Sequence, residues 1–456
     1  MSKDNRLIVS KFGGSSMADA TAMNRSAAIV AGQKSSVVVV SATYGTTNQI
    51  IEAAGHAENG RKPEADAIVK QIRDKHYEIA DELGASDAVR DSLEELLMEF
   101  ESLLNDLQSF PDQSLRIRDA IYGIGERLSS RLFTECLEKH GLSSRYFDAA
   151  SIIRTDDRYS RATPVFDEVE RLSNEHLKPL VEAATPETIV TQGFIGSTAL
   201  GIRTTLGRGG SDYSAAIMAW ALQADVLEIW TDVGGVATTD PRITPEARPI
   251  RELSFQEAAE LATFGAKILH PSMLIPAIWR ETPVYVGSSI NPEEGGTWIY
   301  RDVGEAPLVR AVTIRRKQSL LTITTPDMLN TYGFLHKVFK VFNDHRVSVD
   351  SITTSEISVA MTVDDVTLED HDMLRELEEL GRLHIEKSYE LVAVIGNNIN
   401  HTAGLARKMF KALADINVRM ICQGASKHNF CVLVDEGRGE EAVRRLHAKL
   451  IEGDVD

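Results

Sequence analysis

Short apolar runs of strand length recur along the N-terminal two thirds of the chain, and longer helical patterns separate them. The runs are Leu7–Phe12, Val37–Val40, Thr188–Thr191, Val226–Trp230 and Val284–Val286. A glycine turn and a helical pattern at Ala18–Val30 follow the first run, and a loop rich in hydroxyl side chains follows the second. Strands that end in such loops predict a parallel sheet whose ligands bind at the carboxyl ends of the strands.

Two other patterns complete the chain. Between about Ala53 and His140, leucine and isoleucine recur at spacings of three and four, which predicts amphipathic packing helices. Beyond about Ala306 the chain repeats itself at an offset of 71 residues, which pairs Gly333 with Gly404. Each copy predicts an α+β unit of about 70 residues, which we expect to pack against its twin or another subunit. The predicted strands and helices that open the copies are Leu320–Thr324, Phe334–Asn343, Leu391–Ile395 and Leu405–Ala414.

Composition narrows the possible partners. The 456 residues correspond to roughly three domains. A net charge of −18 argues against a nucleic acid or an anionic membrane as partner. The three cysteines have neither metal-ligand spacing nor a disulfide framework, and no apolar stretch reaches the length of a membrane span. We therefore expect a cytoplasmic protein with no membrane partner.

The segment Thr204–Ala216, TTLGRGGSDYSAA, is the most distinctive stretch of the chain. Three glycines surround Arg208, and Ser211 and Asp212 precede an apolar helical pattern. A glycine loop that leads into a helix N-terminus is suited to bind a phosphate or a carboxylate. A mobile surface turn with a chance arginine is the alternative.

Other candidate residues lie close to glycines. Lys11 lies near the end of the first strand, two residues before Gly13 and Gly14, and Glu126 follows two glycines in a helical region. Taken singly, Lys11 and Glu126 are more typical of solvated surface side chains. Together with the Thr231-Asp232 pair they fit phosphoryl transfer, but the chain has neither a P-loop nor a dinucleotide fingerprint. The residues alone indicate an α/β enzyme of anionic substrates with a regulatory repeat.

Four motifs extend this interpretation. Lys11–Ser16, Gln192–Gly196, Thr204–Asp212 and Trp230–Val236 together resemble the amino-acid kinase family, and within it the lysine-sensitive aspartokinases. The resemblance covers essentially the whole chain and implies an α/β fold, with a carbamate-kinase-like αβα sandwich followed by two ferredoxin-like ACT domains. The implied boundaries are 1–306 for the kinase domain, 315–390 for the first ACT domain, and 307–314 with 391–456 for the second.

The resemblance also implies an activity, namely phosphorylation of the β-carboxylate of L-aspartate by ATP with Mg²⁺, the first step of lysine, threonine and methionine synthesis. Lys11 would stabilise the transferring phosphoryl group and Asp212 would hold Lys11 in place. The implied aspartate-binding residues are Ser41, Thr47, Glu126 and Arg208. The implied nucleotide-binding residues are Gly13, Gly14, Ser15, Thr231, Asp232, Arg242 and Lys267. One departure is Ala237, where the family usually has an aromatic residue.

The charges of the repeat favour one ligand. The first copy has Asp350 and Glu356 where the second has Ile421 and Lys427, so a ligand with a side-chain ammonium fits the first copy better. Similarity to the lysine-sensitive class implies lysine as an effector bound by Met328, Thr331, Gly333, Phe334, Leu335, Ser348, Val349, Asp350, Ser355 and Glu356. Alternatively, these are ordinary turn and packing residues and the module serves only dimerisation. Because ACT modules commonly pair between subunits, the resemblance also implies a homodimer or homotetramer assembled through the ACT domains.

Two rival functions stay open at this point. One is phosphorylation of a different acid by the same fold, such as N-acetylglutamate, glutamate, uridylate or carbamate. The other is amino-acid sensing by a protein whose kinase domain is inactive. The presence of Lys11, Asp212, Arg208 and Glu126 argues against the second rival.

Overall fold

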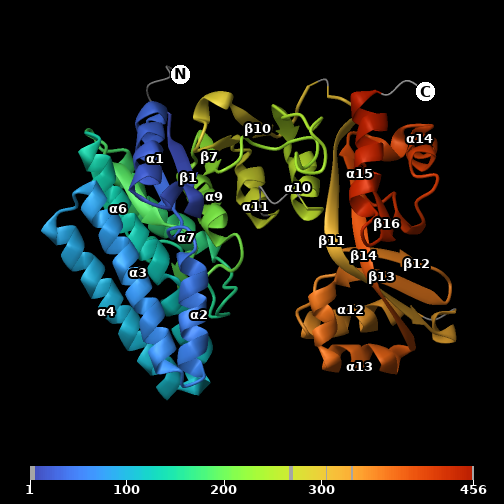
Figure 1. The fold of residues 1–456 in the computed structure, drawn as a ribbon, viewed down its shortest axis with the longest axis horizontal. Helices are drawn as coiled ribbons and strands as arrows, with labels where there is room; N and C mark the ends of the chain where they lie inside the picture. Colours follow the sequence, from blue (N-terminus) through green and yellow to red (C-terminus); the bar gives the residue numbers. More distant parts are fainter. Residues whose placement is uncertain (1–5, 266–270, 305, 330–331, 454–456) are drawn as a thin grey trace. The chain divides into compact units, whose positions relative to one another are not determined.

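The computed structural model describes residues 6–265, 271–304, 306–329 and 332–453, which form two compact units (Figure 1). As far as they are described, Met1–Val236, Arg251–Phe255 and Lys267–Val303 make up the first unit. Ala237–Ile250, Gln256–Ala266 and Gly304–Asp456 make up the second. No helix among these described residues is long and apolar enough to span a membrane.

An eight-stranded sheet forms the centre of the first unit, with the strand order β3-β4-β2-β1-β7-β9-β10-β8. The six strands from β3 to β9 pair in parallel, which confirms the parallel sheet that the sequence predicts. Their carboxyl ends therefore lie at one edge of the sheet. The bounds are β1 Ile8–Phe12, β2 Val37–Val40, β3 Ser144–Phe147, β4 Thr188–Gln192, β7 Val226–Thr231, β8 Glu252–Ser254, β9 Val284–Ser288 and β10 Gly296–Tyr300.

Helices cover both faces of this sheet. On one face, the buried side chains of Phe12, Val38, Val40 and Trp230 form one core with leucines and isoleucines of the helical region. Its helices are α1 Ala20–Gln33, α2 Thr46–Glu58, α3 Lys62–Leu83, α4 Asp87–Ser109, α5 Ser114–Tyr122 and α6 Ile124–Lys139, of which α2, α3 and α4 lie side by side (Figure 1). On the other face, α9 Gly210–Leu222 contacts β1, β7 and α11 Pro271–Arg280.

The second unit contains a six-stranded antiparallel sheet with the order β12-β13-β11-β14-β16-β15. Its two central strands, β11 Val309–Thr324 and β14 Arg382–Gly396, are much longer than the runs that the sequence predicts. The pairing of β11 with β14 shifts register between Arg315 and Leu320. Polar residues at this junction interrupt the apolar alternation although the hydrogen-bonded ladder continues, which explains why the sequence predicts shorter strands.

Each copy of the repeat has its own hydrophobic core around these shared strands. One core includes Phe334, Val338 and Phe342, and the other includes Leu405 and Met409. The elements are α12 Phe334–Asp344, β12 Ser351–Thr354, β13 Ser358–Asp364 and α13 His371–Leu380 in the first copy, and α14 Leu405–Ala412, β15 Val418–Cys422, β16 Asn429–Asp435 and α15 Gly439–His447 in the second.

Backbone geometry repeats along with the sequence. Gly333 and Gly404 occupy equivalent positions of the 71-residue repeat. They precede α12 and α14 with φ angles of 85° and 83°. A residue with a side chain is strained in this left-handed conformation, so glycine is favoured at both positions. The duplication read from the sequence is therefore also a duplication of structure.

Phe133 of α6 offers a test of the first core. Its buried ring lies 5.9 Å from the ring of Phe12, measured between centroids. We expect Phe133→Ala to lower the free energy of unfolding by about 3–5 kcal/mol, because it leaves a cavity between sheet and helices. All four tryptophans lie in the first unit, so urea unfolding followed by tryptophan fluorescence measures this unit.

Phe110→Ala is the matched control, because Phe110 is 52% exposed. This substitution should change the free energy of unfolding by less than about 0.5 kcal/mol. Equal losses in the two variants would contradict the assignment of Phe133 to the core.

Candidate active site

Lys11 lies next to a glycine turn at the carboxyl end of β1. The backbone N–H of Gly13 donates to the carbonyl oxygen of Trp230 on the neighbouring strand at 3.1 Å. A Cβ atom on Gly13 would lie 3.4 Å from the Lys11 ammonium nitrogen, so Gly13 is in van der Waals range of the end of the lysine side chain. The turn thus places glycine backbone beside a cation at the edge of the sheet.

An ion pair joins this edge to α9. Lys11 Nζ lies 2.6 Å from Asp212 Oδ1, and the two side chains are only 10% and 16% exposed. Asp212 is in the first turn of α9, where the partial positive charge of the helix N-terminus favours a carboxylate. Two residues singled out from separate stretches of the sequence are therefore in direct contact.

The start of α9 is placed by the turn that follows β4. A Cβ on Gly193 would lie 2.6 Å from Ser211 Cβ, so only glycine permits this approach of the two backbones. The Phe194 N–H donates to Ser214 Oγ at 2.9 Å, and its carbonyl accepts from the Leu206 N–H at 2.9 Å. Sequence reasoning quoted Gly193 as part of a motif but missed this packing role.

Glu126 is buried beside the same edge. It lies in the first turn of α6, and burial raises the pKa of its carboxyl to about 7, although the Ala42 N–H and the positive charge of Lys11 oppose the rise. Its Oε2 atom is buried and has no hydrogen-bond partner among the described residues. A buried carboxylate oxygen without a partner is suited to accept from a ligand's ammonium group.

Ser41 and Thr47 belong to the loop and helix that follow β2. The Ser41 N–H donates to the Phe12 carbonyl at 3.0 Å, and the Ser41 carbonyl accepts from Ser129 Oγ at 2.7 Å. Thr47 is half-buried in the first turn of α2. Both residues therefore lie on segments that adjoin the ends of β1 and β2.

His76 supports this loop from α3, and sequence reasoning missed it. Its Nδ1–H donates to the Ile72 carbonyl at 2.7 Å, which leaves Nε2 to accept from the Thr43 hydroxyl at 3.3 Å. Burial lowers the pKa of His76 to about 4, so the ring is neutral at pH 7. The only sequence signal was a histidine among the apolar positions of a helix, which is usually a packing residue.

The remaining predicted site residues of the kinase domain differ in exposure and in their partners. Arg208 is exposed and makes no ion pair with any described residue. Ser15 and Thr231 are half-buried at the ends of β1 and β7, and the Thr231 hydroxyl donates to exposed Asp232 at 3.0 Å. Arg242 belongs to the second unit and pairs with Asp240 at 2.6 Å, while Lys267 lies outside the described residues.

The predicted effector residues lie in the first copy of the repeat. Asp350 precedes β12, its side chain is 6% exposed, and its Oδ1 lies 2.8 Å from an Arg315 guanidinium nitrogen. Its Oδ2 is buried without a hydrogen-bond partner among the described residues, and burial raises the pKa of this carboxyl to about 6. Gly333, Phe334 and Leu335 lie at the start of α12, and Ser348, Val349, Ser355 and Glu356 lie beside β12 and Asp350. Met328 ends the short 3-10 helix Pro326–Met328, and Thr331 is outside the described residues.

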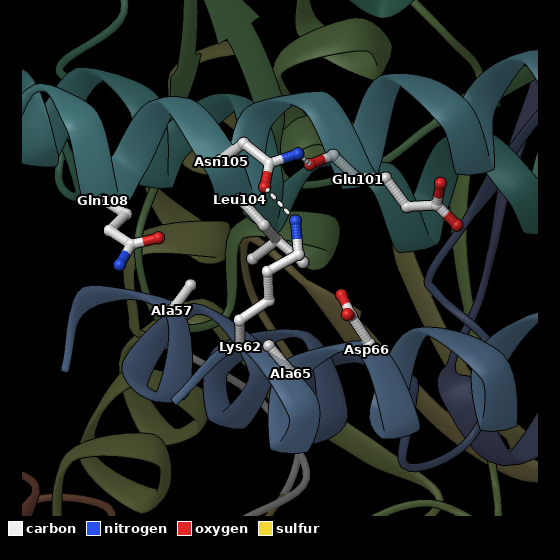
Figure 2. Close-up of a pocket in the computed structure, with 8 residues that line it drawn as sticks. All are labelled: Ala57, Lys62, Ala65, Asp66, Glu101, Leu104, Asn105 and Gln108. Carbon is white, nitrogen blue, oxygen red and sulfur yellow. Dashed lines mark hydrogen bonds between the residues drawn. The ribbon is translucent and has the colours of Figure 1, made fainter. Parts of the chain in front are cut away.

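A separate cavity of about 310 Å³ lies between α2, α3 and α4 (Figure 2). The ammonium of Lys62 crosses it to donate to Asn105 Oδ1 at 2.8 Å. None of its eight lining residues is among the predicted site residues. This cavity is therefore not part of the candidate site.

Comparison with known proteins agrees with the geometry. Residues 6–288 match the model of the amino acid kinase family, and residues 392–450 match an ACT domain model. The chain is 42% identical to lysine-sensitive aspartokinase 3 of Escherichia coli K12, over 98% of this chain and 100% of that protein. It is 36% identical to the chloroplastic aspartokinase 3 of Arabidopsis thaliana, over 98% and 82% of the two chains.

Solved structures show the same likeness. E. coli aspartokinase III in complex with aspartate and ADP, in the R-state, has a TM-score of 0.89 and 42% identity, with 97% of this chain and 99% of that chain covered. The same enzyme in complex with lysine and aspartate, in the T-state, has a TM-score of 0.81, with 98% and 100% covered. This chain belongs to the amino acid kinase family, and within that family to the aspartokinases.

Proposed function

We propose that this chain transfers the γ-phosphoryl group of ATP to the β-carboxylate of L-aspartate and so forms 4-phospho-L-aspartate. The ion pair of Lys11 with Asp212 at a glycine-lined sheet edge is the observation that supports this most strongly. The relative from E. coli whose solved structure contains aspartate and ADP supports the identity of both substrates. The product would enter the synthesis of lysine, threonine and methionine.

In this reaction a β-carboxylate oxygen forms a bond to the γ-phosphorus while the bond from that phosphorus to the bridging oxygen of ADP breaks. The carboxylate is already ionised at pH 7, so the nucleophile needs no general base. Lys11 would stabilise the negative charge of the transferring group, and Asp212 would orient Lys11. Gly13 and Gly14 would allow the phosphates to approach the backbone.

Recognition of aspartate would use charges of opposite sign. Exposed Arg208 has donors to bind the α-carboxylate in a bidentate manner. Glu126, with its unpartnered Oε2, would accept from the α-ammonium group. Ser41 and Thr47 would add hydrogen bonds from the loop and helix after β2. This arrangement favours a free α-amino acid over N-acetylglutamate, uridylate and carbamate, which have no α-ammonium group.

The nucleotide would bind near the ends of β1 and β7, with Ser15, Thr231 and Asp232 as contacts. The resemblance also assigns Arg242 and Lys267 to the nucleotide and notes Ala237 where an aromatic residue is usual, and these assignments stay predictions. The described residues contain no group of three or more His, Cys, Asp or Glu side chains that could hold a metal ion. Mg²⁺ is commonly held by substrate phosphates with one or two carboxylates; exposed Asp232 would be such a carboxylate, and the ion would neutralise phosphate charge.

Regulation by lysine is the second part of the proposal. Asp350, with one buried oxygen unpartnered, would accept from the side-chain ammonium of lysine. The T-state structure of the E. coli relative in complex with lysine and aspartate supports this effector. We place the domain boundaries at 1–306, 315–390, and 307–314 with 391–456. Cytoplasmic location and assembly as a homodimer or homotetramer through the ACT domains also belong to the proposal, and exposed Leu335, Phe339 and Ile352 support such a surface.

Formation of an acyl phosphate is the direct test of the activity. With ATP, Mg²⁺ and L-aspartate, hydroxylamine should trap aspartyl hydroxamate, whereas glutamate and N-acetylglutamate should give little. We expect Lys11→Ala to lower kcat by at least about 100-fold, because it removes the cation that stabilises the transferring group.

Lys70→Ala is the control for that substitution, because Lys70 is exposed on α3 and is not among the predicted site residues. Its kcat should equal that of the unaltered chain. Lysine binding without any consumption of ATP would instead support a sensing protein, and a folded Lys11→Ala variant with near-normal kcat would contradict the proposed mechanism.

The pKa of Glu126 predicts a pH dependence. Only the ionised carboxylate pairs with an ammonium group, and its pKa is about 7 rather than the ordinary 4.5. As pH falls from 8 to 6 at saturating ATP, the ionised fraction falls about tenfold, so the KM for aspartate should rise about tenfold. In Glu126→Gln the KM should be high at both pH values and nearly constant between them.

The KM for ATP, measured over the same pH range, is the internal control for that experiment. It should not follow the titration of Glu126. A KM for aspartate that rises just as steeply in Glu126→Gln would assign the pH dependence to another group.

Lysine inhibition can be tested at Asp350. We expect Asp350→Asn to raise the lysine concentration for half-inhibition at least about tenfold, each variant being compared with its own uninhibited rate, because a charged partner of the ammonium is lost. Asp372→Asn, an exposed change on α13, should keep normal inhibition. If the unaltered chain resists millimolar lysine, alone or with threonine, the feedback hypothesis is wrong.

A further inference from the structure

Asp119 of α5 is a completely buried carboxylate that neither substrate contacts in the proposed mechanism. Its Oδ1 accepts from the Ser160 N–H at 2.9 Å and from the Thr205 hydroxyl at 3.0 Å. Its Oδ2 accepts from the Thr205 N–H at 2.8 Å and from the same Ser160 N–H at 3.0 Å. Every donor comes from one of two segments far from α5 in the sequence.

Such a cluster is costly unless every polar group is satisfied. Burial raises the pKa of Asp119, and the bonds from Ser160 and Thr205 oppose that rise. An ionised carboxylate only accepts hydrogen bonds, which matches the N–H and O–H groups that point at it. In Asp119→Asn, an amide NH₂ group would replace one carboxylate oxygen and would face the N–H and O–H donors in a buried site, so hydrogen bonds would be lost.

The two donor segments border the turn that leads to Arg208. Thr205 is the last residue of β6 Arg203–Thr205, three positions before the arginine. Ser160 has a positive φ of 70°, and a Cβ placed on Gly207 would lie 3.2 Å from the Ser160 carbonyl oxygen. Asp119 thus binds the strand that enters the turn and the segment against which the turn packs.

The helix of Asp119 also leads directly to Glu126. Gly123 joins α5 to α6, and its N–H donates to the Asp119 carbonyl at 3.3 Å. A Cβ on Gly123 would lie 2.7 Å from Ile195 Cγ2, and Ile195 pairs with Thr205 in the β5–β6 ladder. The start of α6 is therefore packed against the same small hairpin that Asp119 binds.

We propose that Asp119 is a positioning residue for the amino-acid substrate, which sets the spacing between Arg208 and Glu126. This inference rests on the proposed roles of these two residues in binding the α-carboxylate and the α-ammonium of aspartate. Two charges bind a small zwitterion well only if their separation matches that of its own charges. Misplacement of a substrate by about 1 Å can lower the catalytic rate about 100-fold. Asp119 acts on the substrate through Arg208 and does not touch the reacting atoms.

Steady-state kinetics of Asp119→Asn test the proposal. The KM for aspartate should rise by about tenfold or more, while the KM for ATP stays within about twofold. Glu135→Gln is the matched control, because Glu135 is also a buried carboxylate that accepts an N–H and an O–H, both from Ser86 at 2.7 Å, away from the hairpin. It should leave both KM values unchanged.

A double mutant separates positioning from a general structural effect. In the Arg208→Ala background, Asp119→Asn should raise the KM for aspartate by less than about twofold further, because the spacing no longer matters. The proposal would be overturned if the effects of the two substitutions on the KM for aspartate were fully additive, or if the KM for aspartate and the KM for ATP rose equally.

If Asp119→Asn does not fold, Thr205→Val provides a second test of the proposal. It removes one of the hydrogen bonds with little change of shape and should raise the KM for aspartate roughly threefold. An unchanged KM in Thr205→Val would overturn the positioning role. If the unaltered chain makes no aspartyl phosphate, the proposed function itself fails, and that result is distinct from both of these.

Discussion

The ion pair between Lys11 and Asp212 is the contact on which the functional edge of the first unit depends. Both side chains are largely withdrawn from water, and a cation in that position is stable only beside an opposite charge. The pair exists because β1 lies centrally in the sheet, with β7 on one side and β2 on the other, and α9 packs across β1. An ammonium held in this way is oriented before a phosphate arrives.

At three glycines the backbone packs closely against neighbouring segments around this edge of the sheet. A Cβ on Gly193 would meet Ser211, one on Gly125 would lie 2.7 Å from Ala42 Cβ, and one on Gly123 would meet Ile195. Each contact seats the start of α9 or α6 directly on a loop or hairpin at the sheet edge. Small residues at these positions therefore serve packing as much as turn formation, and Asp119 adds a polar clamp to the same region.

The two copies of the repeat in the second unit share one fold but differ in polarity at equivalent positions. They share the strands β11 and β14 but have separate hydrophobic cores and equivalent glycines before α12 and α14. Asp350 is buried in one copy, with an oxygen unpaired among the described residues, whereas the equivalent Ile421 is 44% exposed in the other. Both copies keep apolar residues at the positions that form their cores, whereas the equivalent positions 350 and 421 differ in polarity.

The sequence by itself determined the parallel sheet, the packing helices, the duplication and the glycine loops, because periodicity and turn chemistry are local properties of the chain. It also singled out Lys11, Asp212 and Arg208 as residue types that phosphoryl transfer uses, and Glu126 as a carboxylate close behind two glycines, although their roles came from family resemblance. Only the tertiary structure decided that Lys11 meets Asp212, that Glu126 is buried with a raised pKa, and that His76 and Asp119 support the loops. Burial and contact between distant segments depend on strand order and helix packing, which no local pattern encodes.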